Sequence, residues 1–190
     1  KALAAVARKH NLFLHMDGSR ISNAAVSLQQ PFRTFTRDIG VDVLSFGGTK
    51  NGMMFGEAVI FFNTALAKSF PFIRKQGMQL HSKMRFIGAQ FEALLTDELW
   101  KRSATHANNM AARLASGLEK LNVTLTQSVD ANGIFALLDP AIIPALQEEN
   151  FFYVWNEKTF EVRLMCSFDT TEQEVDRFLQ RLADLLEGKK

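Results

Sequence analysis

The sequence is poor in cysteine, in net charge and in long apolar segments, and each shortage argues against a class of protein. The single cysteine, Cys166, cannot form an internal disulfide, which predicts a reducing, cytoplasmic setting. Basic residues number 22 against 20 acidic ones, so the net charge is only +2. Because phosphate neutralisation needs a clustered basic excess, we expect no nucleic-acid partner. No apolar run reaches the ~18 residues of a membrane span, so we expect no membrane partner.

What is present suits a globular protein with a sizeable core. The 190 residues are 47% hydrophobic, which fits one domain or one and a half. The chain begins at Lys1, without an initiator methionine, and runs at once into helix-like sequence. The four histidines and one cysteine lack metal-ligand spacing, so no metal site is expected. We expect Cys166 to be a small buried apolar residue.

Residues 1–100 predict part of an α/β domain. Three short apolar runs that do not alternate with polar residues indicate parallel strands buried on both faces: 12–16, 41–46 and 57–62. Helices are expected over 82–95 and 97–121, and Asn11 is a plausible end for the first helix.

Residues 101–190 predict a small α+β domain. The expected strands are 123–126, 134–138, 151–155 and 160–165. Pro140 would open a short helix that ends near Glu149, and carboxylates after Asp169 would begin the last helix. The aromatic cluster over 151–155 suits a core or an interface better than a base-stacking surface.

Two predicted strand ends carry unusual chemistry. Asp17, in the segment HMDGSR, lies where open α/β sheets bind ligands, although an aspartate there can also simply cap a helix. Lys50, in the segment GGTKNG, follows two glycines that let backbone approach a ligand closely. An ordinary loop lysine is the alternative, and the segment fails the Walker spacing for a phosphate loop.

Together the two residues suggest pyridoxal phosphate chemistry. Lys50 follows Asp17 by 33 residues, and each stands at the end of a predicted strand. A lysine amine can form a Schiff base with the cofactor aldehyde. An aspartate can keep the pyridine nitrogen protonated, which makes the ring an electron sink.

The segments HMDGSRISNA and DVLSFGGTKNGMMFGEAVIFF resemble two blocks of the low-specificity threonine aldolases, in the branch that has GGTK. These are pyridoxal phosphate enzymes of the aspartate-aminotransferase-like fold, and the resemblance covers essentially the whole chain. It departs from the family at Ser19, where alanine is usual. It implies an α/β fold: the C-terminal part of a transferase-like large domain (an αβα sandwich) over 1–100, plus a small α+β domain over 101–190.

The resemblance also implies roles for single residues. Asp17 would pair with the pyridine nitrogen, Lys50 would form the Schiff base, and Arg20 would lie beside the cofactor ring. Thr49 would bind the cofactor phosphate. Arg163, on the strand face opposite Val162 and Leu164, would grip the substrate carboxylate with two parallel hydrogen bonds.

Two further residues have competing interpretations. His15 matches the family's histidine two residues before the aspartate, but a single histidine in an apolar strand is more often structural. Arg85 resembles an arginine that reaches an active site of the family, and a solvated helix arginine is the alternative.

The resemblance implies an aldolase that cleaves the Cα–Cβ bond of threonine or allo-threonine to give glycine and acetaldehyde. The substrate would be a small amino acid, and a homodimer or homotetramer with active sites at the subunit interface is expected. Three large-domain strands and no phosphate cradle before Asp17 predict that the chain is roughly the C-terminal half of the enzyme. The alternatives are a β-eliminating lyase of the same fold and an inactive fragment that self-associates.

Overall fold

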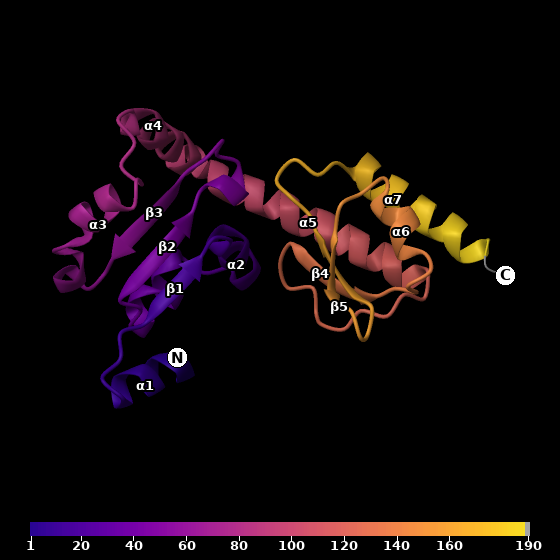
Figure 1. The fold of residues 1–190 in the computed structure, drawn as a ribbon, viewed down its shortest axis with the longest axis horizontal. Coiled ribbons are helices and arrows are strands. Elements are labelled where there is room, and N and C mark those ends of the chain that lie inside the picture. The colour runs from indigo at the N-terminus through magenta and orange to yellow at the C-terminus, as the bar shows by residue number, and fades with distance from the viewer. Residues whose placement is uncertain (189–190) are drawn as a thin grey trace. The chain divides into compact units, whose positions relative to one another are not determined.

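The computed structural model describes residues 1–188, which form two compact units that divide between Arg102 and Ser103 (Figure 1). The elements that begin in unit 1 are α1 (Ala2–Lys9), β1 (His15–Gly18), α2 (Ile21–Leu28), β2 (Val43–Gly47), β3 (Glu57–Phe61), α3 (Phe70–Gln76), α4 (Met84–Leu95) and α5 (Leu99–Lys120). Those of unit 2, into which α5 continues, are β4 (Gly133–Leu137), α6 (Ile143–Gln147), β5 (Tyr153–Asn156), β6 (Glu161–Met165) and α7 (Glu172–Glu187). Along residues 1–188 no helix is long and apolar enough to cross a membrane.

Unit 1 is built on a three-stranded sheet in the order β1-β2-β3. β1 runs parallel to β2, as the sequence predicts, whereas β3 runs antiparallel to β2. The prediction of a third parallel strand was therefore wrong. The connection from β2 to β3 contains no crossover helix, and a chain that returns without a crossover must pair antiparallel.

Helices α2 and α4 cover one face of this sheet. Leu44 and Phe46 are 2% and 6% exposed, and they pack with Ile21 of α2 and Phe91 of α4. The opposite face carries the alternate residues of the strands, and there Val59 is 39% exposed. In residues 1–188 this side of the sheet is the more exposed one. We refer to it below as the open face of unit 1.

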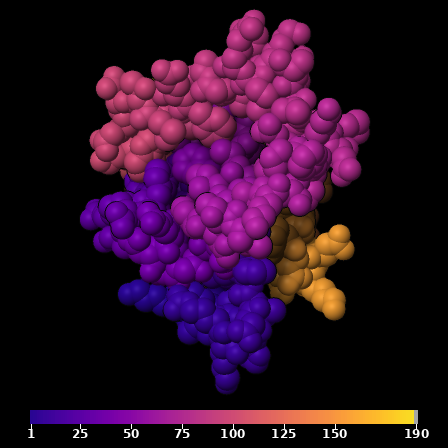
Figure 2. Space-filling model, turned by 90° about the vertical axis from the view of Figure 1, so that its left-hand side faces the viewer, coloured from indigo at the N-terminus to yellow at the C-terminus, as the bar shows by residue number. Residues whose placement is uncertain are grey.

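The stretch from α3 to the start of α4 is unusually exposed for its apolar content. Phe72, Ile73 and Met78 are 72%, 57% and 89% exposed. Figure 2 shows this side of unit 1, with the stretch in magenta. These side chains contribute little to the core of the unit.

Unit 2 has an antiparallel sheet in the order β4-β6-β5, and helices cover one of its faces. Ile134, Val162 and Leu182 have no exposed surface in a core formed with α5, α6 and α7. The last helix begins as predicted near Glu172, where Thr171 and Glu174 form a reciprocal capping box.

Three local predictions are settled by the backbone. Asn11 follows the C-cap His10 of α1 and has φ of 53°, which confirms it as the left-handed residue at that helix end. The predicted strand at 123–126 is wrong, since only a single bridge joins Leu125 to Ala136. The short helix begins at Ile143 rather than at Pro140, with Pro144 in its first turn.

Candidate cofactor site

Parallel pairing of β1 with β2 brings the two chemically unusual strand ends to the same edge of the sheet. Asp17 is the register partner of Ser45, and Gly18 is the partner of Phe46. One residue after β2 ends, a short 3-10 turn spans Thr49–Asn51 and carries Lys50. The segments that hold Asp17 and Lys50, far apart in the sequence, therefore lie side by side at the carboxyl edge of the sheet.

Glycine is required where these strand ends meet. A Cβ built on Gly47 would lie 2.6 Å from Cα of Ser19 and still closer to the Ser19 carbonyl oxygen. A Cβ on Gly18 would lie 2.7 Å from the carbonyl oxygen of Ser45. Both obstacles are backbone atoms, which cannot move away as a flexible side chain can. The glycines therefore set how closely the two segments approach.

Asp17 is not a helix cap. The residue that precedes α2 is Arg20, and no side-chain hydrogen bond caps that helix. The Oδ1 of Asp17 instead accepts a hydrogen bond of 3.0 Å from the backbone N–H of Ser19. The carboxylate is exposed on the open face of unit 1, so the capping interpretation of Asp17 is wrong.

Hydrogen bonds and nearby charges keep Asp17 ionised. The backbone N–H of Ser19 contributes most to holding the pKa of Asp17 below its ordinary value, and slight burial opposes it. The Ser19 side chain, the Lys50 ammonium and His15 lower the same pKa further. Lys50 therefore lies close enough to Asp17 for their charges to interact.

The turn that carries Lys50 is held at both sides. The Thr49 hydroxyl accepts a 2.9 Å hydrogen bond from the Gly56 N–H and donates to the Gly56 carbonyl at 3.4 Å. Asn51 is buried, and its Nδ2 donates to the Trp100 carbonyl at 3.0 Å. Lys50 itself is exposed between these two anchors. Since the Thr49 hydrogen already has an acceptor, its geometry favours bracing the Lys50 turn over binding a phosphate.

The other predicted cofactor residues differ in position. Arg20 is half-buried and lies three residues after Asp17, directly before α2. Arg85 is exposed in the first turn of α4, where its guanidinium lies 4.9 Å from the ring centroid of Phe86. Arg20 thus shares the strand edge with Asp17, while the interaction of Arg85 is a local one.

Arg163 is half-buried in the middle of β6 in unit 2. It is the register partner of Phe135 on one side and of Tyr153 on the other. Its guanidinium lies 5.2 Å from the ring centroid of Trp155. Val162 and Leu164 are buried in the core, so Arg163 lies on the uncovered face, as predicted. Stacking on an aromatic ring leaves the edge of a guanidinium free for a carboxylate.

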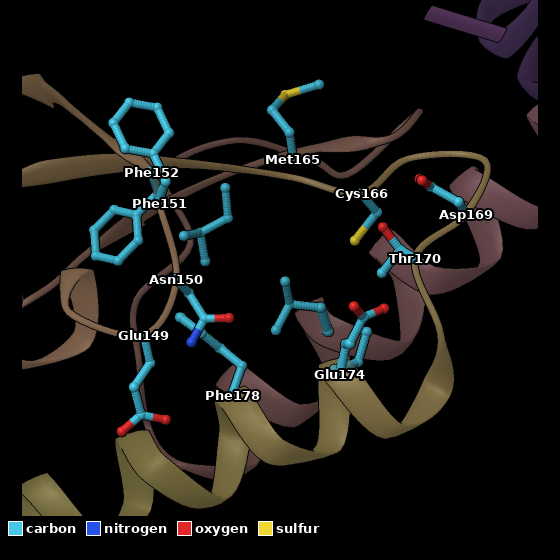
Figure 3. Close-up of a pocket in the computed structure, with 13 residues that line it drawn as sticks. Glu149, Asn150, Phe151, Phe152, Met165, Cys166, Asp169, Thr170, Glu174 and Phe178 are labelled. Carbon is cyan, nitrogen blue, oxygen red and sulfur yellow. The ribbon is translucent and has the colours of Figure 1, made fainter. Parts of the chain in front are cut away.

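A cavity of about 370 Å³ in unit 2 does not suit an anionic cofactor. Glu149, Asp169 and Glu174 place carboxylates along its rim (Figure 3). Cys166 lines it as well, and burial raises the pKa of its thiol to about 11, so the thiol is protonated at neutral pH. This confirms Cys166 as a small buried residue. Carboxylates along the rim disfavour a phosphate there, so the strand ends of unit 1 are the better candidate for the cofactor site.

Two residues of the site are not apparent as functional in the sequence. Ser45 is a polar residue in an otherwise apolar strand, which was a signal, but its position beside Asp17 depends on the register. Asn51 looks like an ordinary turn residue, and its anchoring partner, Trp100, is distant in the sequence.

Residues 1–141 match the family described as beta-eliminating lyase, and the chain belongs to this family. It is 43% identical over 176 residues to the low-specificity L-threonine aldolase of a Pseudomonas species, covering 92% of this chain and 51% of that protein. The identity to the low-specificity L-threonine aldolase of Pseudomonas aeruginosa is also 43%, over 180 residues and the same shares of each chain. The chain thus spans about half the length of these relatives.

Solved structures agree with this assignment. The threonine aldolase of Leishmania major matches with a TM-score of 0.85 and 32% identity, covering 97% of this chain and 54% of that one. An aspartate aminotransferase of Thermus thermophilus matches with a TM-score of 0.70 over 97% of this chain and 51% of that one. At 18% identity the latter supports the fold alone. The predicted α/β fold class and the resemblance to threonine aldolases are confirmed.

The close approach at Gly47 yields a prediction. In Gly47→Ala, the new methyl group meets the Ser19 backbone, so we expect a loss of about 1–3 kcal/mol in the free energy of unfolding. Gly88→Ala is the matched control, because an added Cβ would meet nothing within 4 Å beyond its chain neighbours and its own helix backbone, and alanine favours a helix by about 0.5–1 kcal/mol. Urea unfolding measures both variants. A Gly47→Ala protein as stable as the wild type would contradict the packing argument.

Proposed function

We propose that this chain carries the cofactor-binding residues of a pyridoxal phosphate-dependent aldolase. The reaction is cleavage of the Cα–Cβ bond of L-threonine or L-allo-threonine to glycine and acetaldehyde. The observation that carries the proposal is the position of Asp17 within range of the Lys50 charge, at the carboxyl edge of one parallel strand pair. The identity of 43% to two low-specificity L-threonine aldolases supports the choice of reaction.

The residues at this edge fit pyridoxal phosphate. An exposed carboxylate that is held ionised suits a protonated pyridine nitrogen, and Asp17 has that character. The Lys50 amine, on a braced turn within range of the Asp17 charge, suits covalent attachment of an aldehyde. Arg20, at the same edge, is proposed to contact the ring and its 3-hydroxyl. Arg85 and Thr49 remain predicted contacts on sequence resemblance alone.

The protein's own groups have defined tasks in this reaction. The cofactor, when bound, supplies the electron sink that accepts the pair left by the broken Cα–Cβ bond. The Asp17 carboxylate keeps a proton on the ring nitrogen, because a carboxylate with a lowered pKa remains negative beside it. Lys50 supplies the amine that holds the cofactor before the amino acid enters, and Thr49 and Asn51 fix the turn from which it reaches out.

A β-elimination that releases ammonia is the second candidate, since the matched family is described as beta-eliminating lyase. Both reactions use the same electron sink and differ in the bond that breaks at the β-carbon. The products therefore distinguish them, whereas the Asp17 and Lys50 geometry does not.

The first test measures products. Given L-threonine and pyridoxal phosphate, the protein that carries these residues is expected to form acetaldehyde and glycine in equal amounts. Acetaldehyde is followed with a coupled alcohol dehydrogenase, and ammonia is assayed in the same sample. Release of ammonia and a 2-oxo acid without acetaldehyde would reject the aldolase assignment in favour of β-elimination.

The second test addresses Lys50. Treatment with pyridoxal phosphate and borohydride fixes the cofactor to the attacking amine, and peptide mass spectrometry is expected to find it on Lys50. In Lys50→Ala we expect loss of that adduct and of activity, because no other amine holds this position. Lys68→Ala, at another exposed lysine, is the control and keeps both. Labelling confined to other lysines in the wild type would contradict the assignment.

We further propose that Arg163 binds the carboxylate of the amino-acid substrate. Its stacked, half-buried guanidinium supports this role, since such geometry favours bidentate recognition of a carboxylate. A hydrogen bond to a charged group is worth about 1.5–3 kcal/mol, so Arg163→Gln should raise KM for threonine roughly 10- to 100-fold. The control is Arg177→Gln, an exposed arginine of α7. An unchanged KM in Arg163→Gln would remove Arg163 from the site.

We also propose that the protein assembles into a homodimer or homotetramer with active sites at the subunit interfaces. We expect this assembly in the cytoplasm. The exposed apolar side chains of Phe72, Ile73 and Met78 support an interface on unit 1. Sedimentation equilibrium of the protein gives the number of subunits directly.

A further inference from the structure

One hydrogen bond on the open face of unit 1 has no part in the roles assigned above. Nε2 of His15 lies 2.9 Å from Oγ of Ser45. His15 precedes Asp17 by two residues on β1, so both side chains lie on the same face of the sheet. Ser45 is the register partner of Asp17 on β2, which puts its side chain on that face as well. The imidazole thus crosses from β1 to β2 toward the residue that lies directly beside Asp17.

We propose that His15, anchored by Ser45, is a positioning residue for Asp17 that further stabilises the ionised carboxylate on the open face of the sheet. This inference deepens the proposed function and rests on it. The imidazole acts through Asp17 and need not touch the substrate. The hydroxyl of Ser45 fixes the ring, because a hydrogen bond to one ring nitrogen limits its rotation about the side-chain bonds.

The charges around Asp17 define what His15 adds. The Ser19 N–H makes the largest contribution to the lowered pKa of Asp17, and the Lys50 ammonium and His15 act after it. The charge interaction of His15 with the carboxylate acts in the same direction as that of the Lys50 ammonium.

The size of the effect follows from the spacing. Residues i and i+2 of a strand lie roughly 6 to 7 Å apart, on the same face. Two unit charges at that distance in a water-like medium shift a titration midpoint by about half a pH unit. Because the open face is exposed to solvent, a larger effect is not expected. Removal of the imidazole should therefore raise the pH at which Asp17 becomes protonated by about that amount.

The experiment follows the Asp17 carboxyl group directly in this chain, without cofactor. The 13Cγ chemical shift of Asp17 is titrated in the wild type and in His15→Gln, whose side-chain amide can still bond Ser45. We expect the Asp17 midpoint to rise by about half a pH unit in His15→Gln and by less in Ser45→Ala, where the ring is present but no longer held by the hydroxyl. Ser45→Thr, which keeps the hydroxyl, should restore the wild-type midpoint.

His10→Gln is the matched control, because it removes the same group from an exposed position next to α1. It should leave the Asp17 midpoint unchanged. An equal shift in His10→Gln would mean that net charge alone acts. A midpoint that stays constant in both His15→Gln and Ser45→Ala would overturn the inference.

A second measurement separates this inference from the proposed function. Cofactor binding is followed by absorbance as the pH is lowered. If Asp17 must be ionised to hold pyridoxal phosphate, binding is lost at a higher pH in His15→Gln and Ser45→Ala than in the wild type. If the variants shift the Asp17 midpoint but the wild-type protein binds no pyridoxal phosphate, the function is rejected and the His15–Ser45 pair is kept. Normal cofactor binding with unshifted profiles in both variants would reject the pair and keep the function.

Discussion

The parallel register of β1 on β2 is the constraint on which the rest of unit 1 depends. It sets Asp17 beside Ser45 on the open face and, one residue further, Gly18 beside Phe46 of the core. A slip of one residue would turn the Asp17 carboxylate toward Leu44 and the core, where an unpaired charge is costly. Burial of Leu44 and Phe46 on the covered face therefore fixes where the functional carboxylate points.

The same pairing explains why hydrogen bonding, and not burial, controls the ionisation of Asp17. At an exposed sheet edge, water weakens every charge–charge interaction, so Lys50 and His15 can supply only modest shifts. A backbone N–H held at 3.0 Å is less affected by solvent, and Ser19 makes the largest contribution to the lowered pKa. The turn after β1 can approach β2 closely because Gly47 carries no side chain. Backbone packing and carboxylate ionisation thus depend on the same few residues.

The sequence predicts which residues form the site better than it predicts which residues they contact. Asp17 and Lys50 were recognisable because each follows an apolar run, and Arg163 because it alternates with two apolar residues. The direction of β3 was not predictable, since an apolar run has the same composition in either orientation. Nor could the partner of Thr49 be predicted, because it depends on how the loop closes. That closure uses Gly56 at φ of 138°, a conformation that residues with a side chain rarely adopt.

In each unit helices cover one face of the sheet, and strand residues with proposed chemistry, Asp17 and Arg163, lie on the other. In β2 the core residue Leu44 is followed by Ser45, and in β6 the core residue Val162 is followed by Arg163. Alternation along a strand thus assigns neighbouring residues to stability and to ligand chemistry. A substitution at Leu44 or Val162 would act through cavity formation and packing, whereas one at Ser45 or Arg163 would change charge and hydrogen bonding while the core stays filled. This separation is what allows polar variants on the open faces to be interpreted as effects on the site.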